Sequence, residues 1–233
     1  MEIKHIFQRS EKKYKITAAQ YEQLYAIIKQ YMYLDEYGRH TINNIYYDND
    51  TFDLTLRSMD KPLYKEKFRI RCYGLATPQT PLFLELKKKH DGIVYKRRAT
   101  LSQQETYHFL QDYTQSSSQI LKEIAFTFQQ YHLKPKMFIA YERMAYTNQE
   151  SELRITFDQN IRYRLHNLNF HNDTHETTFL QDNDYLMEIK CKHSIPLWLS
   201  KALSDLQIYP TSYSKVGNCF QHILKKGELS YVK

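Results

Sequence analysis

Charged and apolar residues alternate with a period of two, most clearly in residues 64–73, YKEKFRIRCY. Side chains on a β-strand point alternately to opposite faces, so this stretch predicts a strand with one basic and one mostly apolar face. The basic face carries Lys65, Lys67, Arg69 and Arg71. Neighbouring charges on it lie about 7 Å apart and repel by roughly 2 kcal/mol per pair at an effective dielectric constant near 20. The row therefore needs solvent screening or a bound anion.

The same alternation recurs elsewhere in the chain. We expect strands at 6–16, 41–47, 64–73, 82–89, 93–99, 137–147, 152–164 and 185–191. In most of them the basic residues share one face and the opposite face is apolar. These further basic residues are Arg9, Lys13, Lys87, Lys96, Arg98, Arg143, Arg154 and Lys190. One basic strand alone is most simply a solvated surface, but the repetition favours a common anion site.

Stretches with a helical period separate several of these strands. Thr17 is a candidate N-cap for a helix to about Tyr31, and Ser102 with Glu105 gives the capping-box pattern for a helix to about Tyr113. Further helices are expected from 118 to about 133, from 196 to about 206, and from Ser214 and Lys215 onward. Their apolar stripes suit packing against the apolar faces of the strands.

Basic strand faces combined with helix-covered apolar faces predict an unusual sheet. We expect an α+β protein, a closed antiparallel β-barrel whose lumen is charged and whose outside is covered by helices. Such a lumen would form a tunnel for an elongated polyanion, such as inorganic polyphosphate or a nucleoside triphosphate. Residues 1–233 are expected to form a single domain of this kind.

Composition supports a folded protein with an anionic partner. The 233 residues carry a net charge of +7 and 15% aromatic residues, with only 5 Gly and 6 Pro. Three scattered Cys residues suggest a reduced setting, and we see no signal peptide and no apolar run long enough to span a membrane. We therefore expect a cytoplasmic protein.

Single acidic residues interrupt the basic faces. Glu11, Glu85 and Glu188 each lie two positions from a Lys on the same face. One interpretation is an ion pair that limits repulsion, and for Glu85 this is about as good as the alternative. The alternative is a carboxylate that holds Mg²⁺ or Mn²⁺ against phosphate groups, because these cations prefer oxygen ligands. Phosphoryl transfer needs little beyond such a metal, positioning and positive charge.

An ordered set of short motifs resembles one known family. RSEKKY at 9–14 resembles the opening ExExK signature of the triphosphate tunnel metalloenzymes, with Arg9 in place of the first Glu, as in their VTC domain branch. The likeness continues through 46–48 (YYD), 67–73 (KFRIRCY), 84–87 (LELK), 96–98 (KRR), 141–143 (YER), 153–158 (LRITFD), 187–190 (MEIK) and 214–215 (SK). An aromatic residue usually follows the last pair, and here Val216 stands there.

The resemblance implies a polyphosphate polymerase that transfers the γ-phosphate of ATP to a growing inorganic polyphosphate chain, with Mn²⁺ or Mg²⁺. Catalytic roles would fall to Lys13, Arg69, Arg71, Lys87, Arg143, Arg154 and Lys215. Substrate contacts would come from Arg9, Tyr47, Lys67, Lys96, Arg98, Lys190 and Ser214. Glu188 would hold the metal, with Glu85 as a weaker candidate, and the substitution at Arg9 favours one metal over two. A membrane-protein partner and the oligomeric state stay open.

Three alternatives compete with a polymerase. The same tunnel with water as acceptor would make a triphosphatase, and a tunnel without turnover would be a polyphosphate- or nucleotide-binding module. Nucleic-acid binding would need aromatic residues interleaved with the basic ones on one exposed face. Phe68, Leu86 and Phe157 instead alternate with the charges and fall on the opposite face, so we expect no nucleic-acid partner.

Overall fold

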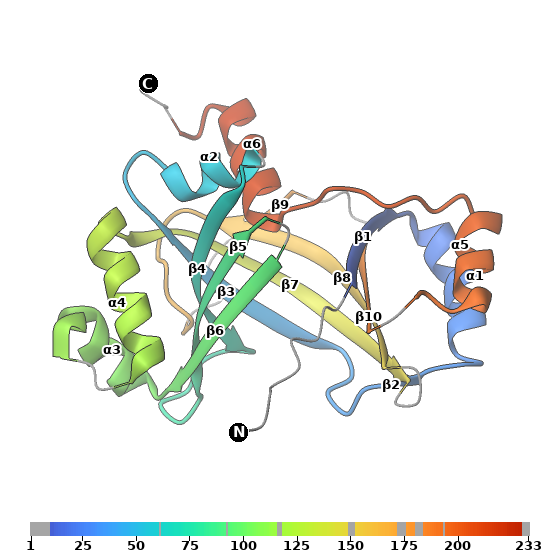
Figure 1. Ribbon diagram of the computed structural model, residues 1–233, viewed down its shortest axis with the longest axis horizontal. Helices are drawn as coiled ribbons and strands as arrows, with labels where there is room; N and C mark the ends of the chain where they lie inside the picture. The colour runs from blue at the N-terminus through green and yellow to red at the C-terminus, as the bar shows by residue number, and fades with distance from the viewer. Residues whose placement is uncertain are drawn as a thin grey trace. The chain divides into compact units, whose positions relative to one another are not determined.

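A computed structural model describes residues 10–60, 62–91, 93–115, 118–148, 152–171, 176–179, 184–192 and 194–229. Its strands form one ten-stranded sheet, and every pairing with a described register is antiparallel (Figure 1). The strands are β1 (Ser10–Ile16), β2 (Tyr33–Leu34), β3 (His40–Asp48), β4 (Tyr64–Tyr73), β5 (Leu82–His90), β6 (Ile93–Leu101), β7 (Lys134–Asn148), β8 (Leu153–Arg164), β9 (Thr177–Thr178) and β10 (Tyr185–Cys191).

The strand order is open. It runs β1-β10-β8-β7-β3-β4-β5-β6, with β2 beside β7 and β9 beside β8, and the described residues of β1 and β6 do not pair. A closed barrel requires the first and last strands of the order to pair, so the barrel predicted from the sequence is wrong for this part of the chain. The prediction failed because alternation identifies the two faces of a strand but does not say which strands are neighbours. The α+β class is confirmed, whereas an enclosed tunnel stays a prediction.

The helices are α1 (Ala18–Ile28), α2 (Asp53–Met59), α3 (Gln103–Gln111), α4 (Gln119–Tyr131), α5 (Leu197–Asp205) and α6 (Lys215–Lys226), with a 3₁₀ turn at Tyr113–Gln115. The predicted N-caps are confirmed at Thr17 and Ser102, and both belong to complete capping boxes. Ser214 caps α6 through its side chain. Among the described residues, no helix combines the length and hydropathy that a membrane crossing requires.

The chain divides into two compact units. Unit 1 comprises residues 1–40, 141–161 and 180–213, and unit 2 comprises residues 41–140, 162–179 and 214–233. Long strands β7 and β8 contribute to both. The single domain expected from the sequence stays a prediction.

Unit 1 has a core in which the apolar faces of β1, β8 and β10 pack against two helices. Ile155, Phe157, Met187 and Ile189 are at most 1% exposed, and they belong to one cluster with Leu24 and Ile28 of α1 and Leu199 and Leu203 of α5. The two helices contact each other and lie side by side in Figure 1. The predicted covering of the apolar face by helices is thus found in this unit.

Unit 2 repeats the arrangement with β4 and β5. Phe68, Ile70, Leu84 and Leu86 are at most 3% exposed and pack in one cluster with Phe109 of α3 and Ile124 and Phe128 of α4. Both helices also contact β6, next to which they are drawn in Figure 1. Burying each such side chain contributes about 1.5–3 kcal/mol, which fixes the apolar face inward and leaves the basic residues on the other face.

Candidate functional site

The basic face of unit 2 is built in rows across three strands. Because the register pairs Arg69 with Glu85 and Glu85 with Arg98, these side chains stand side by side on β4, β5 and β6. The next row pairs Lys67 with Lys87 and Lys87 with Lys96. Residues from separate strands that the sequence assigned to phosphate binding are therefore brought together in this unit.

Glu85 lies at the centre of these rows. Its side chain is 2% exposed and contacts four cations. Arg69 Nη2 is 2.7 Å from Oε2, Lys96 Nζ is 2.9 Å from Oε1, and Arg71 Nε is 3.8 Å from Oε2, while Arg98 also pairs with Oε1. Burial alone would raise the pKa of Glu85, but the charges of Arg69 and Arg71 outweigh it and hold that pKa well below its usual range.

This arrangement favours the ion-pair interpretation of Glu85 over the metal interpretation. Both carboxylate oxygens are already contacted by guanidinium or ammonium groups, which would repel an approaching cation. The donor set around Glu85 does not fit a metal ion. Glu85 instead holds the four surrounding cations in place. One carboxylate does not neutralise four positive charges, so the cluster keeps a net positive charge that favours binding of an external anion.

Strand β3 contributes polar contacts to the same face. Arg69 Nη1 donates to the Tyr46 hydroxyl over 2.9 Å, and Arg71 Nε donates to Asn44 Oδ1 over 3.1 Å. The sequence pattern does not predict Tyr46 or Asn44 as site residues. It predicts Tyr47, but this residue is 8% exposed and lies in the core, where the centroid of its ring is 5.3 Å from that of Phe68. It therefore faces away from Arg69, because adjacent strand residues point to opposite sides.

The N-terminus of α6 adjoins these rows in unit 2. Lys67 Nζ donates to Ser214 Oγ over 2.8 Å, and Ser214 Oγ accepts from the backbone N–H of Gly217 over 3.2 Å. Lys215 is the first residue of the helix. The predicted Lys67, Ser214 and Lys215 thus lie together at a helix end whose backbone N–H groups favour anions.

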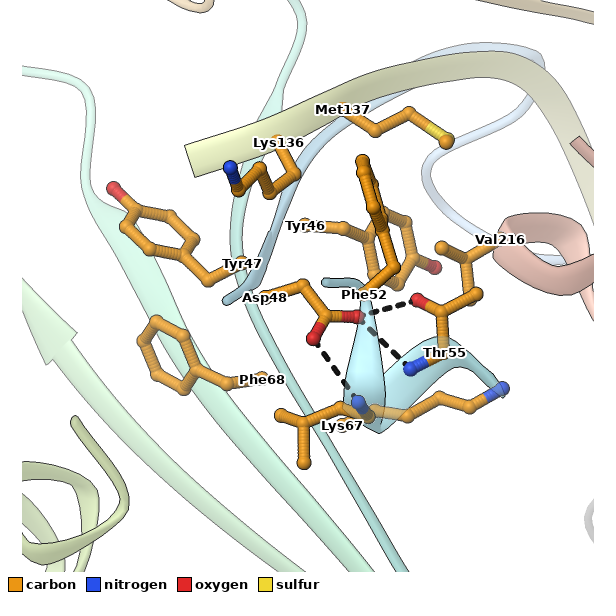
Figure 2. Close-up of a pocket in the computed structure, with 11 residues that line it drawn as sticks. Tyr46, Tyr47, Asp48, Phe52, Thr55, Lys67, Phe68, Lys136, Met137 and Val216 are labelled. Atoms are coloured by element: carbon orange, nitrogen blue, oxygen red, sulfur yellow. Dashed lines mark hydrogen bonds between the residues drawn. The ribbon is translucent and has the colours of Figure 1, made fainter. Parts of the chain in front are cut away.

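Asp48 supports this part of unit 2 from the end of β3. Its carboxylate accepts from the backbone N–H groups of Leu54 and Thr55 over 3.0 and 2.9 Å and from the Thr55 hydroxyl over 2.7 Å. Figure 2 shows these bonds beside Lys67, in a small pocket that Tyr46 also lines. Burial raises the pKa of Asp48, while the hydrogen bonds act in the opposite direction. Asp48 therefore fixes the start of α2 and has a structural role.

Unit 1 carries a second charged group on β1, β10 and β8. The register places Lys13 opposite Glu188 and Glu188 opposite Thr156, and in the next row Glu11 opposite Lys190 and Lys190 opposite Arg154. Lys190 Nζ is 2.6 Å from Glu188 Oε1 and 3.7 Å from Glu11 Oε2. Lys13 Nζ donates to the Tyr213 carbonyl over 3.1 Å.

Two predicted arginines of unit 1 already have carboxylate partners. Arg143 forms a two-point contact with Asp158, over 2.6 and 2.8 Å, and Arg154 Nη2 donates to Asp35 Oδ2 over 3.0 Å. Burial would lower the pKa of Arg143, and the charge of Asp158 overcomes this and raises it. Alternation places Asp158 on the same face as Arg154, so the sequence pattern could have identified it as a partner.

The carboxylates of unit 1 are the candidate ligands for a divalent cation. No set of three or more His, Cys, Asp or Glu side chains suited to a metal ion occurs in the described part of the chain. Glu188 and Glu11 nevertheless approach one ammonium group together. Mg²⁺ in phosphate-binding sites commonly uses one or two carboxylates and takes its other ligands from phosphate and water. The carboxylate pair of unit 1 fits that requirement.

Arg9, which the sequence predicts as a substrate contact, lies outside the described residues.

Comparisons with known proteins identify the family. The model of the VTC domain matches residues 8–224, so the chain belongs to the VTC domain family. A candidate adenylate cyclase from Bacillus halodurans is similar in structure, with a TM-score of 0.54 and 15% identity over 88% of this chain and 92% of that one. A candidate adenylate cyclase from Vibrio parahaemolyticus gives a TM-score of 0.47 and 11% identity over 93% of this chain and 97% of that one. No curated protein matches the sequence.

The Bacillus likeness, at this identity, shows a similar fold and nothing about activity. The family match confirms the resemblance seen in the motifs.

Proposed function

We propose that the protein is a polyphosphate polymerase that uses ATP. A terminal oxygen of the polyphosphate chain attacks the γ-phosphorus of ATP, the bond from that phosphorus to the β–γ bridging oxygen breaks, and ADP leaves. The chain thereby gains one phosphate. The observation that carries the proposal is the ordered cluster of Arg69, Arg71, Lys96 and Arg98 around Glu85.

The charge balance of that cluster supports an anionic substrate. Four cations share one carboxylate, and Lys67 and Lys87 add positive charge in the adjacent row. Phosphoryl transfer depends mainly on positioning the phosphates and neutralising their charge, so a rigid set of Arg and Lys side chains is the machinery that the reaction requires. Arginine suits this role because its planar guanidinium can contact two phosphate oxygens at once.

Two observations support a bound divalent cation in this reaction, namely the family resemblance and the carboxylate pair of unit 1. Glu188 would be its main ligand, with Glu11 beside it. A bound Mn²⁺ or Mg²⁺ would supply positive charge to phosphate oxygens. Glu85 has no part in this, because its oxygens are occupied by four cations.

A triphosphatase is the second candidate. It would use the same cations and transfer the γ-phosphate to water. Solvent access favours it, because Lys87 is exposed and the Lys96 side chain is 47% exposed, so water reaches this face of unit 2.

The test is to incubate the protein with ATP and Mn²⁺ and follow the reaction by phosphorus NMR. A polymerase gives ADP and the signals of internal phosphates in long chains. Orthophosphate without internal phosphate signals would replace the polymerase by the triphosphatase. Unchanged ATP would refute both and leave a binding module.

A further inference from the structure

A surface cavity of about 560 Å³ lies in unit 2. Its walls come from the turn before α2, the start of β7, the segment after β8 and helix α6, and most of them are apolar. The apolar residues are Phe52, Pro135, Leu165, Phe220, Leu224 and Leu229. Sites for small molecules have volumes of about 300–1,000 Å³ and such mostly apolar linings. None of the described residues assigned to phosphate or metal binding lines this cavity, so it is a separate candidate site.

Phe52 lines the cavity in a strained backbone conformation. Its φ of 57° and ψ of 34° lie in the left-handed region, which bulky residues rarely adopt. The Asn49 side chain holds this turn, because it accepts from the Asp53 backbone N–H over 2.9 Å and donates to the Asp53 carboxylate over 2.8 Å. The Phe52 ring is thereby fixed beside that of Phe220, with ring centroids 4.9 Å apart. Strained residues cluster at ligand-binding sites, so this conformation supports a binding role for the wall.

Lys136 brings positive charge to these apolar walls, with its Nζ 5.6 Å from the centroid of the Phe52 ring. It shares the Asp50 carboxylate with Lys134, at distances of 2.5 and 2.7 Å. Hydrogen bonds from Lys134 and Lys136 lower the pKa of Asp50 to about 2, so this carboxylate is ionised at neutral pH. One carboxylate does not neutralise two ammonium groups, and His166 adds ring nitrogens to the same lining.

Glu228 is the other acidic residue of the lining, and it also has partners within unit 2. Its Oε2 accepts from the Tyr163 hydroxyl over 2.9 Å, and its Oε1 is 3.9 Å from Lys226 Nζ. Because both acidic side chains of the lining are already paired, the cavity favours an anionic ligand over a cationic one.

We propose that this cavity binds a small amphipathic anion, a molecule with an apolar ring or chain and one acidic group. The apolar part packs against Phe52, Phe220 and Leu224, and the acidic group accepts a hydrogen bond from the Lys136 ammonium. A few placed polar groups in an apolar lining fix the orientation of a ligand in this way. The inference does not rest on the proposed function, because the cavity shares no residue with the cationic rows around Glu85.

The probe is 2-naphthoate, and its binding to the full chain is measured by isothermal titration calorimetry without nucleotide or metal. A dissociation constant of about 1 mM or lower is expected from the usual affinity per ligand atom. The uncharged analogue 2-naphthylmethanol has the same ring system. It should bind about tenfold more weakly, because it cannot form the charged hydrogen bond with Lys136.

Three variants test where the probe binds. Lys136→Met should weaken 2-naphthoate binding about tenfold and leave 2-naphthylmethanol binding unchanged, because only the acid uses the ammonium group. Lys134→Met is the matched control, since Lys134 also pairs with Asp50 but does not line the cavity. It should weaken 2-naphthoate binding about twofold at most. Leu224→Trp fills the cavity and should abolish binding of both compounds, and the two Lys variants keep the proposal testable where this substitution prevents folding.

Absence of 2-naphthoate binding, equal affinities for the acid and the alcohol, or equal weakening by Lys136→Met and Lys134→Met would overturn the inference. If one of these occurs while ATP is still converted to polyphosphate, the proposed function stands and only this site is wrong. If 2-naphthoate binds as expected but ATP is not consumed, the site stands and the proposed function fails.

Discussion

Replacing Glu85 with Gln removes the one carboxylate that four cations share in unit 2. Breaking a buried ion pair by deleting one partner costs about 3–5 kcal/mol, because the remaining charge is left uncompensated. We expect the lower end, about 3 kcal/mol, since the side chains of Arg69, Lys96 and Arg98 are 25–47% exposed and are partly solvated. The loss should appear in the free energy of unfolding measured with urea at neutral pH.

Tripolyphosphate should restore part of the lost stability. An external anion replaces the missing negative charge, and it no longer competes with Glu85 for the same guanidinium groups. The Glu85→Gln variant should therefore gain more in melting temperature from saturating tripolyphosphate than the wild type gains.

Glu66→Gln is the matched control for this experiment. Glu66 lies on the opposite face of β4, is 5% exposed, and accepts from the Tyr131 hydroxyl over 3.1 Å. Its loss should also destabilise the protein, but tripolyphosphate should stabilise that variant no more than the wild type. An equal or smaller gain for Glu85→Gln than for the wild type would refute the role assigned to Glu85.

The same variant gives a pH test. The pKa of Glu85 in the folded protein lies below its value in the unfolded chain, which is about 4.3. Ionised Glu85 therefore stabilises the fold fully above about pH 4.3, and this contribution is lost as the pH falls through the lower, folded-state pKa. The stability difference between wild type and Glu85→Gln should be constant from pH 6 to 8 and shrink below about pH 4.

Further predictions concern turnover, binding and stability. Glu188→Ala should abolish metal-dependent turnover while leaving the fold intact, and retained activity would exclude Glu188 as the metal ligand. Saturating tripolyphosphate should stabilise the wild type by about 2.7 kcal/mol at a hundredfold excess over its dissociation constant, and the absence of any shift would count against an anion site. Calorimetry should show weaker tripolyphosphate binding in Lys87→Met than in Lys88→Met, because Lys88 pairs with Glu66 on the other face of the sheet. Equal affinities of the two variants would contradict this assignment of faces. Asp158→Asn should cost about 3–5 kcal/mol in urea unfolding, since it breaks the buried two-point contact with Arg143, and a loss below 1 kcal/mol would be inconsistent with it.

The sequence predicted the two faces of most strands correctly because alternation follows directly from strand geometry. Lys67, Arg69 and Lys87 share a face as expected, and Phe68 and Leu86 are buried under helices on the other. The assignment was harder in β3, where polar and aromatic residues occupy both faces. The pattern there does not distinguish Tyr46, which contacts Arg69, from Tyr47, which lies in the core.

What alternation could not give was the pairing of strands and the partner of each charge. The open order between β1 and β6 depends on long-range register, which no local pattern encodes. Glu85 looked equally suited to a metal or an ion pair, because its four cationic partners come from β4 and β6.

The most direct test of the account is a crystal structure with bound tripolyphosphate. The account predicts phosphate density on the basic face of unit 2, within hydrogen-bonding distance of Arg69, Arg98 and Lys87. Tripolyphosphate held elsewhere, for example by Lys134 and Lys136 beside Asp50, with no density on that face, would contradict it.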